Sequence, residues 1–369
     1  MGEPLKVGIV GAGKISRQYT TTLARLPGVA LTRVADLDAD RASALAADFA
    51  GVQAVPVSDL IADDAVDLVL NLTVPRAHAE VALAALAAGK HVYGEKPLAA
   101  TTLEGRAILD AARAAGRTVG CAPDTVLGTG VQTARAALDA GEIGVPVAAT
   151  AFMVTPGHER WHPDPEFYYE PGGGPLLDMG PYYLTALVTL LGPVRRVTGL
   201  ASTPRATRTI GDGPRAGTVF PVRVPTHQTG VLEHAGGALT TIMMSFDVWA
   251  GRLPRIEVYG TDGTLSVPDP NHFDGPVEVF TSASASASAS ASGEGWTRLP
   301  ERAGYRDAGR GTGVADLAEA LRTGAPPRAN GELAYHVLDV MECLHTAAEA
   351  GAAVTVRSTC EVPAPVPLA

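Results

Sequence analysis

The stretch GIVGAGKIS, residues 8–16, is the feature that most limits how this chain can fold. It joins an apolar run at 5–10 to a helical pattern at 15–26 through Gly11, Gly13 and a small Ser16. Glycines at a strand-to-helix turn let the backbone approach a pyrophosphate, and the helix N-terminus offers free N–H groups and a positive dipole end. The stretch therefore predicts a dinucleotide-binding turn, with an ordinary tight turn as the alternative.

An acidic residue follows at the spacing that such a turn requires. Asp36 closes a second apolar run, residues 30–36, and lies 23 positions beyond Gly13. A carboxylate at this place hydrogen-bonds a ribose 2′-hydroxyl and repels a 2′-phosphate. The residue after it is not a phosphate-binding arginine. We therefore expect NAD as the cofactor, with NADP left open because Lys14 or Arg41 is within reach of a phosphate.

The first third of the chain alternates short strands with helices rich in alanine and leucine. A helix is expected at 38–49, a strand at 66–73, a helix at 75–89, and a further helix from a capping box at Thr101 and Glu104 to a glycine stop at 116. Alternation of this kind is typical of a parallel sheet with right-handed crossovers. It predicts an α/β, Rossmann dinucleotide-binding domain over residues 1–122.

The pattern changes after about residue 123. A helix at 125–140 leads into strands separated by glycine and proline turns, and two helices, at 313–324 and 331–351, finish the chain. Such a pattern favours an antiparallel sheet. We expect a second, α+β domain over residues 123–369 with a large open, mostly antiparallel sheet. A strict Ser/Ala alternation at 282–292 is interpreted as a disordered or extended surface insertion.

Bulk composition excludes several classes of protein. The net charge is −10 and the pI is near 5.4, which argues against nucleic acid or an anionic membrane as partners. No apolar run is long enough to span a bilayer. The three cysteines lie far apart, so neither a metal site nor a disulfide framework is expected and a reducing compartment fits. These properties favour a cytoplasmic protein.

Two further stretches carry groups suited to acid–base chemistry. Lys96, in GEKPL, follows the fifth expected strand at the sheet edge where ligands bind, although an exposed Lys–Glu pair is an alternative. Asp178 and Tyr182, in GGGPLLDMGPYY, are four residues apart and would share one face of a helix. The alternative is that Asp178 caps a helix beginning near Met179 and that Tyr182 is a core aromatic.

Taken together, G-x-G-x-x-S, EKP and GGG-x-L-x-D-x-G-x-Y resemble the Gfo/Idh/MocA family of nicotinamide-dependent oxidoreductases over nearly the whole chain. The resemblance implies a reaction on sugars, inositols or related cyclic alcohols, with Lys96, Asp178 and Tyr182 as the catalytic groups. Most members carry histidine where this chain has Tyr182. The resemblance also implies that the open sheet of the second domain mediates a homodimer or homotetramer.

The turn, the acid and the resemblance together give the expected sites. The cofactor-binding set is Gly11, Ala12, Gly13, Lys14, Ile15, Asp36, Thr73, Pro75, His78, Glu95 and Lys96. The substrate-binding set is Lys96, Asp124, Trp161, His162, Asp178 and Tyr182. Trp161 and His162 belong to a loop rich in aromatic residues, and they form either one wall of a sugar pocket or the packing of that loop on itself.

The hypothesis for the reaction is that a secondary ring alcohol gives its hydride to NAD and its proton to the protein. An unperturbed tyrosine has a pKa of about 10, and a lysine cation nearby favours the phenolate. Lys96 and Tyr182 would then work as one acid–base unit, oriented by Asp178. Two other classes stay open: a lyase or glycosidase that oxidises the sugar only transiently, and a non-catalytic module that senses NAD and sugar.

Overall fold

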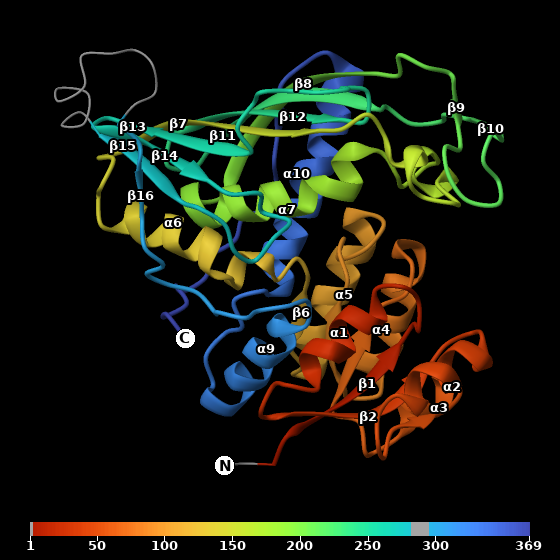
Figure 1. Cartoon of the computed structure of the whole chain (residues 1–369). Coiled ribbons are helices and arrows are strands. Elements are labelled where there is room, and N and C mark those ends of the chain that lie inside the picture. The colour runs from red at the N-terminus through yellow and green to blue at the C-terminus, as the bar shows by residue number, and fades with distance from the viewer. Residues whose placement is uncertain (1–2, 282–294) are drawn as a thin grey trace. The chain divides into compact units, whose positions relative to one another are not determined.

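The computed structural model describes residues 3–281 and 295–369, and the chain divides into two compact units (Figure 1). Unit 1 is Met1–Leu127 with Asp307–Leu338, and unit 2 is Gly128–Arg306 with Asp339–Ala369. The return of the chain to unit 1 at Asp307 was not foreseen from the sequence. The domain boundary after residue 122 stays a prediction, and the expected insertion at 282–292 lies outside the described residues.

Unit 1 contains a six-stranded parallel sheet in the order β3-β2-β1-β4-β5-β6, counted over its described residues. Its strands are β1 (Leu5–Val10), β2 (Val29–Ala35), β3 (Gln53–Ala54), β4 (Leu68–Asn71), β5 (His91–Gly94) and β6 (Val119–Cys121). Its helices are α1 (Ser16–Leu23), α2 (Ala39–Ala47), α3 (Val57–Ala62), α4 (His78–Ala87), α5 (Thr102–Ala115) and α9 (Thr312–Thr323), with short turns η1 (Pro75–Ala77) and η2 (Thr125–Leu127).

The central strands of this sheet are buried and mostly apolar because helices cover both faces. In β1 and β4, the side chains of Val7, Ile9, Leu68 and Leu70 are 0% exposed. The capping box that begins α5 is present, with the Thr101 side chain accepting from the Glu104 amide, and the helix ends at a left-handed glycine. The expected Rossmann domain is confirmed. The two-residue β3 and the six-residue α3 were missed, since neither is long enough to show a periodic pattern.

Over its described residues, unit 2 contains a nine-stranded sheet in the order β16-β15-β14-β13-β7-β12-β11-β8-β17, and a small β10-β9 ribbon. Its strands are β7 (Pro146–Val154), β8 (Val194–Ser202), β9 (Thr207–Thr209), β10 (Val219–Pro221), β11 (His227–His234), β12 (Leu239–Ser245), β13 (Ile256–Gly260), β14 (Gly263–Val267), β15 (Glu278–Thr281), β16 (Thr297–Arg298) and β17 (Val354–Thr355). Its helices are α6 (Thr129–Asp139) and α7 (Pro175–Leu191), with turns η3 (His158–Arg160) and η4 (Glu166–Tyr169). Helix α10 (Gly331–Ala350) begins in unit 1 and ends in unit 2.

The nine-stranded sheet is mostly antiparallel, as expected. Within the described ranges β7 and β12 run parallel, and the remaining neighbours are antiparallel. Across residues 3–281 and 295–369, no helix combines the length and apolar character needed to cross a membrane.

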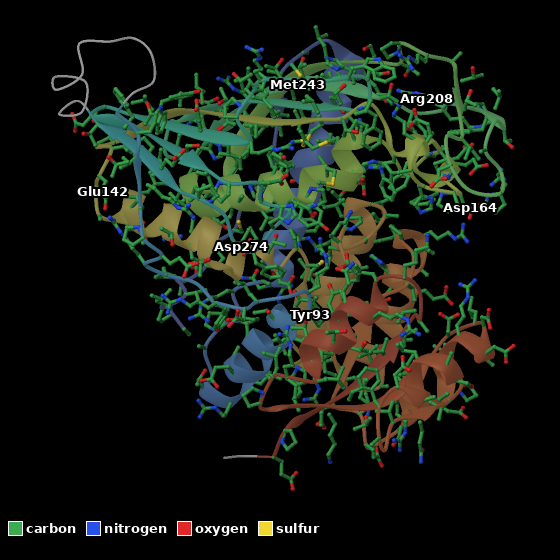
Figure 2. All side chains as sticks on the ribbon, in the orientation of Figure 1. Tyr93, Glu142, Asp164, Arg208, Met243 and Asp274 are labelled. Atoms are coloured by element: carbon green, nitrogen blue, oxygen red, sulfur yellow. The ribbon has the colours of Figure 1, made fainter. Side chains whose placement is uncertain are left out.

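The two faces of this sheet differ. Helix α7 packs against β7, β11 and β12 on one face (Figure 1). The other face carries a registered row across four strands, Leu200, Thr229, Met243 and Phe152, whose side chains are half-buried or exposed. Figure 2 shows Met243 on the side of the sheet away from α7. Unit 2 is therefore a two-layer α+β structure with one open sheet face.

Candidate active site

The central strands of unit 1 end in register. Val10 at the end of β1 pairs with Ala35 of β2 and with Asn71 of β4, and Asn71 pairs with Gly94 of β5. The residues that directly follow these four ends are Gly11, Asp36, Leu72 and Glu95. They lie at the carboxyl edge of the sheet, at the point where the strand order reverses direction. This edge is where ligands bind in open α/β sheets.

The glycine turn at this edge has the form of a pyrophosphate cradle. Gly11 has φ +105°, and a Cβ there would lie 2.6 Å from the Leu72 carbonyl oxygen, so only glycine fits. A Cβ on Gly13 would meet no described atom within 4 Å, which leaves its outer side open to a ligand. Ser16 closes the turn because its Oγ donates to the Gly13 oxygen at 2.6 Å. No side chain of the described residues caps α1.

The carboxylate of Asp36 faces this turn. Its Oδ2 accepts a hydrogen bond from the Ala12 amide at 2.6 Å, and its Oδ1 accepts one from the Asp38 amide at 2.8 Å. Lys14 is exposed and Ile15 is half-buried at the start of α1. The open turn, the uncapped helix and the adjacent acid fit a dinucleotide, whose pyrophosphate and adenosine ribose these residues would hold.

Thr73, Pro75 and His78 follow β4 beside this turn, and a residue not expected from the sequence, Asn71, joins Thr73 to His78. The Asn71 Oδ1 accepts from the Thr73 hydroxyl at 2.6 Å, and its Nδ2 donates to the His78 carbonyl at 3.0 Å. Pro75 begins the short helix η1. The His78 ring lies 2.7 Å from the Pro97 oxygen and 3.1 Å from the Thr73 oxygen. Burial lowers the pKa of His78, although its two carbonyl partners oppose the shift, and the ring braces the loop after β4 against the EKP turn.

The EKP turn is fixed from inside the unit. Glu95 is 8% exposed; its Oε1 accepts from the Tyr19 hydroxyl at 2.7 Å and its Oε2 from the Lys96 amide at 3.0 Å. The alternative of an exposed Lys–Glu pair is therefore wrong, because the carboxylate is buried against α1. Tyr19 was not selected from the sequence, since a tyrosine in a helical pattern is ordinarily a core residue.

Asp124 lies under the start of α9 and is 0% exposed. Its Oδ2 accepts hydrogen bonds from the amides of Gly311, at 2.8 Å, and Gly313, at 3.0 Å. Burial raises the pKa of Asp124 to about 6, although the two amides oppose the shift. The structure thus shows Asp124 holding a helix N-terminus, and its expected contact with substrate stays a prediction.

In unit 2, helix α7 carries the other two expected catalytic residues. It begins at Pro175, so Asp178 lies in its first turn, where a carboxylate suits the positive end of the helix dipole. The alternative in which Asp178 caps a helix beginning near Met179 is wrong. Asp178 and Tyr182 occupy one face of α7; the Asp178 side chain is 18% exposed and Tyr182 is 5% exposed.

A histidine that the sequence analysis passed over meets Asp178. His158 Nε2 lies 3.0 Å from Asp178 Oδ2. The aromatic loop holds three histidine and tryptophan candidates within five residues, and nothing in their spacing separates His158 from Trp161 or His162. Only the fold shows which of them turns toward α7.

Trp161 and His162 lie in a chain of rings that continues from His158. Their ring centroids are 5.4 Å apart, and His162 lies 5.4 Å from Phe167 and 5.7 Å from Tyr168. Trp161 is 56% exposed and Phe167 is 57% exposed. The loop is therefore packed by its own aromatics, and at the same time it presents two apolar ring faces on its surface.

The glycine turn, the acid after the second strand and the parallel sheet define a dinucleotide-binding oxidoreductase of Rossmann type. Two family models match the sequence: the oxidoreductase family with an NAD-binding Rossmann fold over residues 5–122, and the GFO/IDH/MocA C-terminal domain over residues 131–266. The chain belongs to the Gfo/Idh/MocA family, and its homologues are NAD(P)-dependent dehydrogenases and reductases.

Curated relatives and solved structures agree with this assignment. The chain is 31% identical over 264 residues to 1,5-anhydro-D-fructose reductase of Ensifer adhaerens, which covers 70% of this chain and 74% of the relative. It is 30% identical over 354 residues to D-xylose 1-dehydrogenase (NADP(+)) 2 of Haloferax volcanii, and this match covers 94% of this chain and 98% of the relative. A solved structure of an NAD-binding oxidoreductase from Klebsiella pneumoniae is 25% identical in sequence and has a TM-score of 0.79. The match covers 96% of this chain and 99% of that structure.

Proposed function

We propose that the protein transfers a hydride between NAD(P) and a secondary alcohol or ketone of a sugar, glycoside or cyclitol. The reductase and dehydrogenase named above, which act on an anhydro sugar and on xylose, support the substrate class. The observation that carries the proposal is the acid and phenol on one face of α7, Asp178 and Tyr182, in a chain whose other unit has a dinucleotide turn. A carboxylate and a phenol together supply hydrogen bonds and a proton path for a hydroxyl group.

In the proposed reaction the ring carbon gives up a hydride while its hydroxyl gives up a proton, leaving a ketone. Bound nicotinamide supplies the hydride acceptor. Lys96 and Tyr182 together form the acid–base group that takes the proton from the substrate oxygen, because the pKa values of coupled titratable groups belong to the pair and not to either residue. Asp178 orients the reacting groups by accepting a hydrogen bond, for example from a second substrate hydroxyl, and balances the positive charge. The reverse proton and hydride movements reduce a ketone.

Trp161 and His162 are proposed to bind the sugar through the apolar side of its ring. The large exposed fraction of Trp161 supports this role, since an aromatic face in water is available for stacking. Asp124 acts less directly in this proposal: by holding the two amides at the start of α9, it keeps the loop after β6 in place.

The test is absorbance at 340 nm with a panel of pyranoses, glycosides, anhydro sugars and inositols, each with NAD and with NADP. Turnover of one compound by the wild-type chain, lost in Lys96→Met with NAD binding retained, supports the proposal. Lys6→Met, at the opposite end of β1 from the glycine turn, is the matched control and should retain activity. Turnover with NADP alone would contradict the expectation from Asp36. Tightly bound NAD with no net change in absorbance at 340 nm would favour the transient-oxidation lyase instead. A Lys96→Met variant that retains its full biological output would favour the non-catalytic module that senses NAD and sugar.

We further propose that a second copy of the chain covers the open face of the nine-stranded sheet. The row of Leu200, Thr229, Met243 and Phe152 gives a continuous, largely apolar strip across four strands. Strips of this kind on a surface mark interaction sites. Light scattering coupled to size-exclusion chromatography should show a dimer or tetramer, and Met243→Arg should shift it toward monomer. Leu103→Arg, at a residue 81% exposed in unit 1, is the control and should leave the assembly unchanged.

A further inference from the structure

We propose that His158 is a positioning residue for the reaction, which fixes the Asp178 carboxylate by donating a hydrogen bond from Nε2–H to Oδ2. The inference rests on the proposed function, because it assigns a role toward a group that the reaction uses. The geometric basis is the 3.0 Å separation between Nε2 and Oδ2. An ionised carboxylate only accepts hydrogen bonds, so the proton of this pair must lie on Nε2.

The surroundings of the ring select one tautomer. Nδ1 is buried, and among residues 3–281 and 295–369 it has no hydrogen-bond partner. A second proton on Nδ1 would place an N–H donor in a buried position without an acceptor, which is costly. The neutral ring with its proton on Nε2 avoids this cost. A buried ring nitrogen that lacks a hydrogen-bond donor is less costly than a buried N–H that lacks an acceptor.

Aromatic neighbours hold the plane of the imidazole. Its centroid lies 4.5 Å from that of Phe246, 4.6 Å from that of Tyr168 and 5.3 Å from that of Trp161, with tilted or edge-on geometry. Phe246 directly follows β12, Tyr168 belongs to η4, and Trp161 lies in the loop itself. Because three aromatic neighbours already restrict the ring, its Nε2 stays directed at Asp178. The ring therefore loses little further rotational freedom when the hydrogen bond forms.

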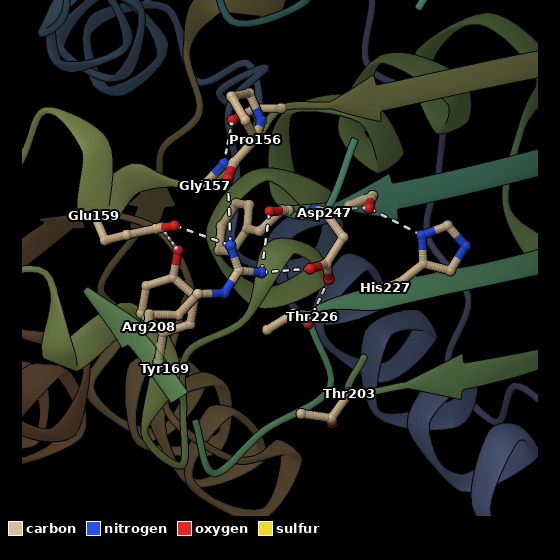
Figure 3. A network of polar contacts seen from close by, with 12 residues as sticks. Pro156, Gly157, Glu159, Tyr169, Thr203, Arg208, Thr226, His227 and Asp247 are labelled. Carbon is tan, nitrogen blue, oxygen red and sulfur yellow. Dashed lines mark hydrogen bonds and ion pairs between the residues drawn. The ribbon is translucent and has the colours of Figure 1, made fainter. Parts of the chain in front are cut away.

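A buried ionic network holds the backbone that carries His158 (Figure 3). The guanidinium of Arg208, in β9, reaches Glu159 at 2.9 Å, Asp247 at 2.5 Å and the Phe246 carbonyl at 3.2 Å. Its side chain is 1% exposed, and the Tyr169 hydroxyl donates to the same Glu159 carboxylate. Because Glu159 is the next residue along the chain, the network fixes His158 from its immediate neighbour.

Glycine makes this approach possible. Gly157 has φ +112°, and a Cβ there would lie 2.2 Å from a Glu159 carboxylate oxygen. The chain can therefore turn sharply before His158, which sends Glu159 inward to Arg208 and the imidazole toward α7. The loop is built to hold one histidine in one orientation, which is the arrangement expected of a residue that orients another.

The first experiment reads the tautomer without any substrate. Two-bond ¹H–¹⁵N spectra of the full chain, labelled at its nine histidines, separate the Nε2–H from the Nδ1–H form. The signal of His158 is the one lost in His158→Phe. We expect the Nε2–H pattern, and we expect that signal to move in Asp178→Asn. A dominant Nδ1–H pattern, or a signal indifferent to Asp178→Asn, would overturn the inference.

The second experiment uses the substrate that the wild-type chain turns over. His158→Phe keeps a ring in the aromatic shell and removes the donor, whereas His158→Gln removes the ring and retains a donor near the position of Nε2. We expect His158→Phe to lower kcat about 10- to 100-fold, the effect of one charge-assisted hydrogen bond. The KM and the Kd for NAD should change by less than about 3-fold, since binding contacts remain. His158→Gln should recover most of the lost kcat.

Controls separate this role from a merely structural one. His345→Phe, at a half-buried histidine of α10, should leave kcat unchanged. Equal losses of kcat in His158→Phe and His158→Gln, or full activity in His158→Phe, would overturn the positioning role. If the wild-type chain turns over no compound of the panel, the proposed function fails, and the histidine spectra alone then decide whether His158 holds Asp178.

Discussion

Two buried carboxylates of unit 1 and two of unit 2 are held in different ways. In unit 1, Glu95 and Asp124 are held by a tyrosine hydroxyl and by backbone amides. In unit 2, Glu159 and Asp247 share the guanidinium of Arg208, which is itself buried (Figure 3). The first arrangement supplies hydrogen bonds from neutral groups, and the second supplies a full opposite charge.

This difference has a physical consequence for each unit. A carboxylate held by neutral donors keeps a desolvation cost, and burial accordingly raises the pKa of Asp124 to about 6. A carboxylate beside a guanidinium has its charge compensated, but removal of that one cation leaves two buried charges unpaired. The Asp124 site should therefore respond to pH, and the Arg208 site should respond to loss of a single side chain.

The largest loss of stability is expected when the buried guanidinium of Arg208 is removed. Arg208→Met should lower the free energy of unfolding by about 3–5 kcal/mol, because Glu159 and Asp247 then stay buried without an opposite charge. Urea unfolding followed by circular dichroism measures the change. Arg205→Met, at an exposed arginine three residues earlier, is the control and should cost less than about 0.5 kcal/mol. A small loss at Arg208 would show that the network is replaceable by water.

A smaller effect, dependent on pH, is expected at Asp124. Its folded-state pKa of about 6 exceeds the ordinary value of 3.8, so the folded state binds more protons between these values. The free energy of unfolding therefore gains a contribution as the pH falls from 7 to 4, on the order of 2–3 kcal/mol. Asp124→Asn lacks this titration, so the wild type should gain stability relative to the variant over that range. Urea unfolding of both proteins at pH 7 and pH 4.5 tests the sign, and a constant difference would contradict it.

The smallest effect is expected at two tyrosine hydroxyls, one in each unit, that each donate a hydrogen bond to a buried carboxylate. Tyr19 donates to Glu95 and Tyr169 donates to Glu159. Tyr19→Phe should cost about 2 kcal/mol and Tyr169→Phe about 1 kcal/mol, since Glu159 keeps Arg208 whereas Glu95 keeps an amide. Thermal and urea unfolding of the two variants measure the difference. Equal losses of unfolding free energy in the two variants would mean that the nearby guanidinium does not change the contribution of the tyrosine hydroxyl. That result would contradict the contrast drawn between the two pairs of carboxylates.

Much of unit 1 follows from local sequence. The glycine turn, the capping box at Thr101 and the strand that ends just before Asp36 each depend on residues close together in the chain, and each is where it was expected. The large antiparallel sheet of unit 2 was also foreseen in kind, because turn residues divide its strands. The order of its strands and the parallel β7–β12 pair were not, since pairing between distant segments leaves no mark in either segment alone.

The sequence by itself determined the kinds of element, the cofactor turn and the residues from which chemistry is expected, because these depend on backbone freedom and on side-chain type at short range. The tertiary structure alone decided which polar groups meet. His158 reaches Asp178 across 20 positions, and Arg208 reaches Glu159 across 49. Contacts at such separations arise from the packing of whole elements around a core, and a single sequence does not encode them in any local pattern.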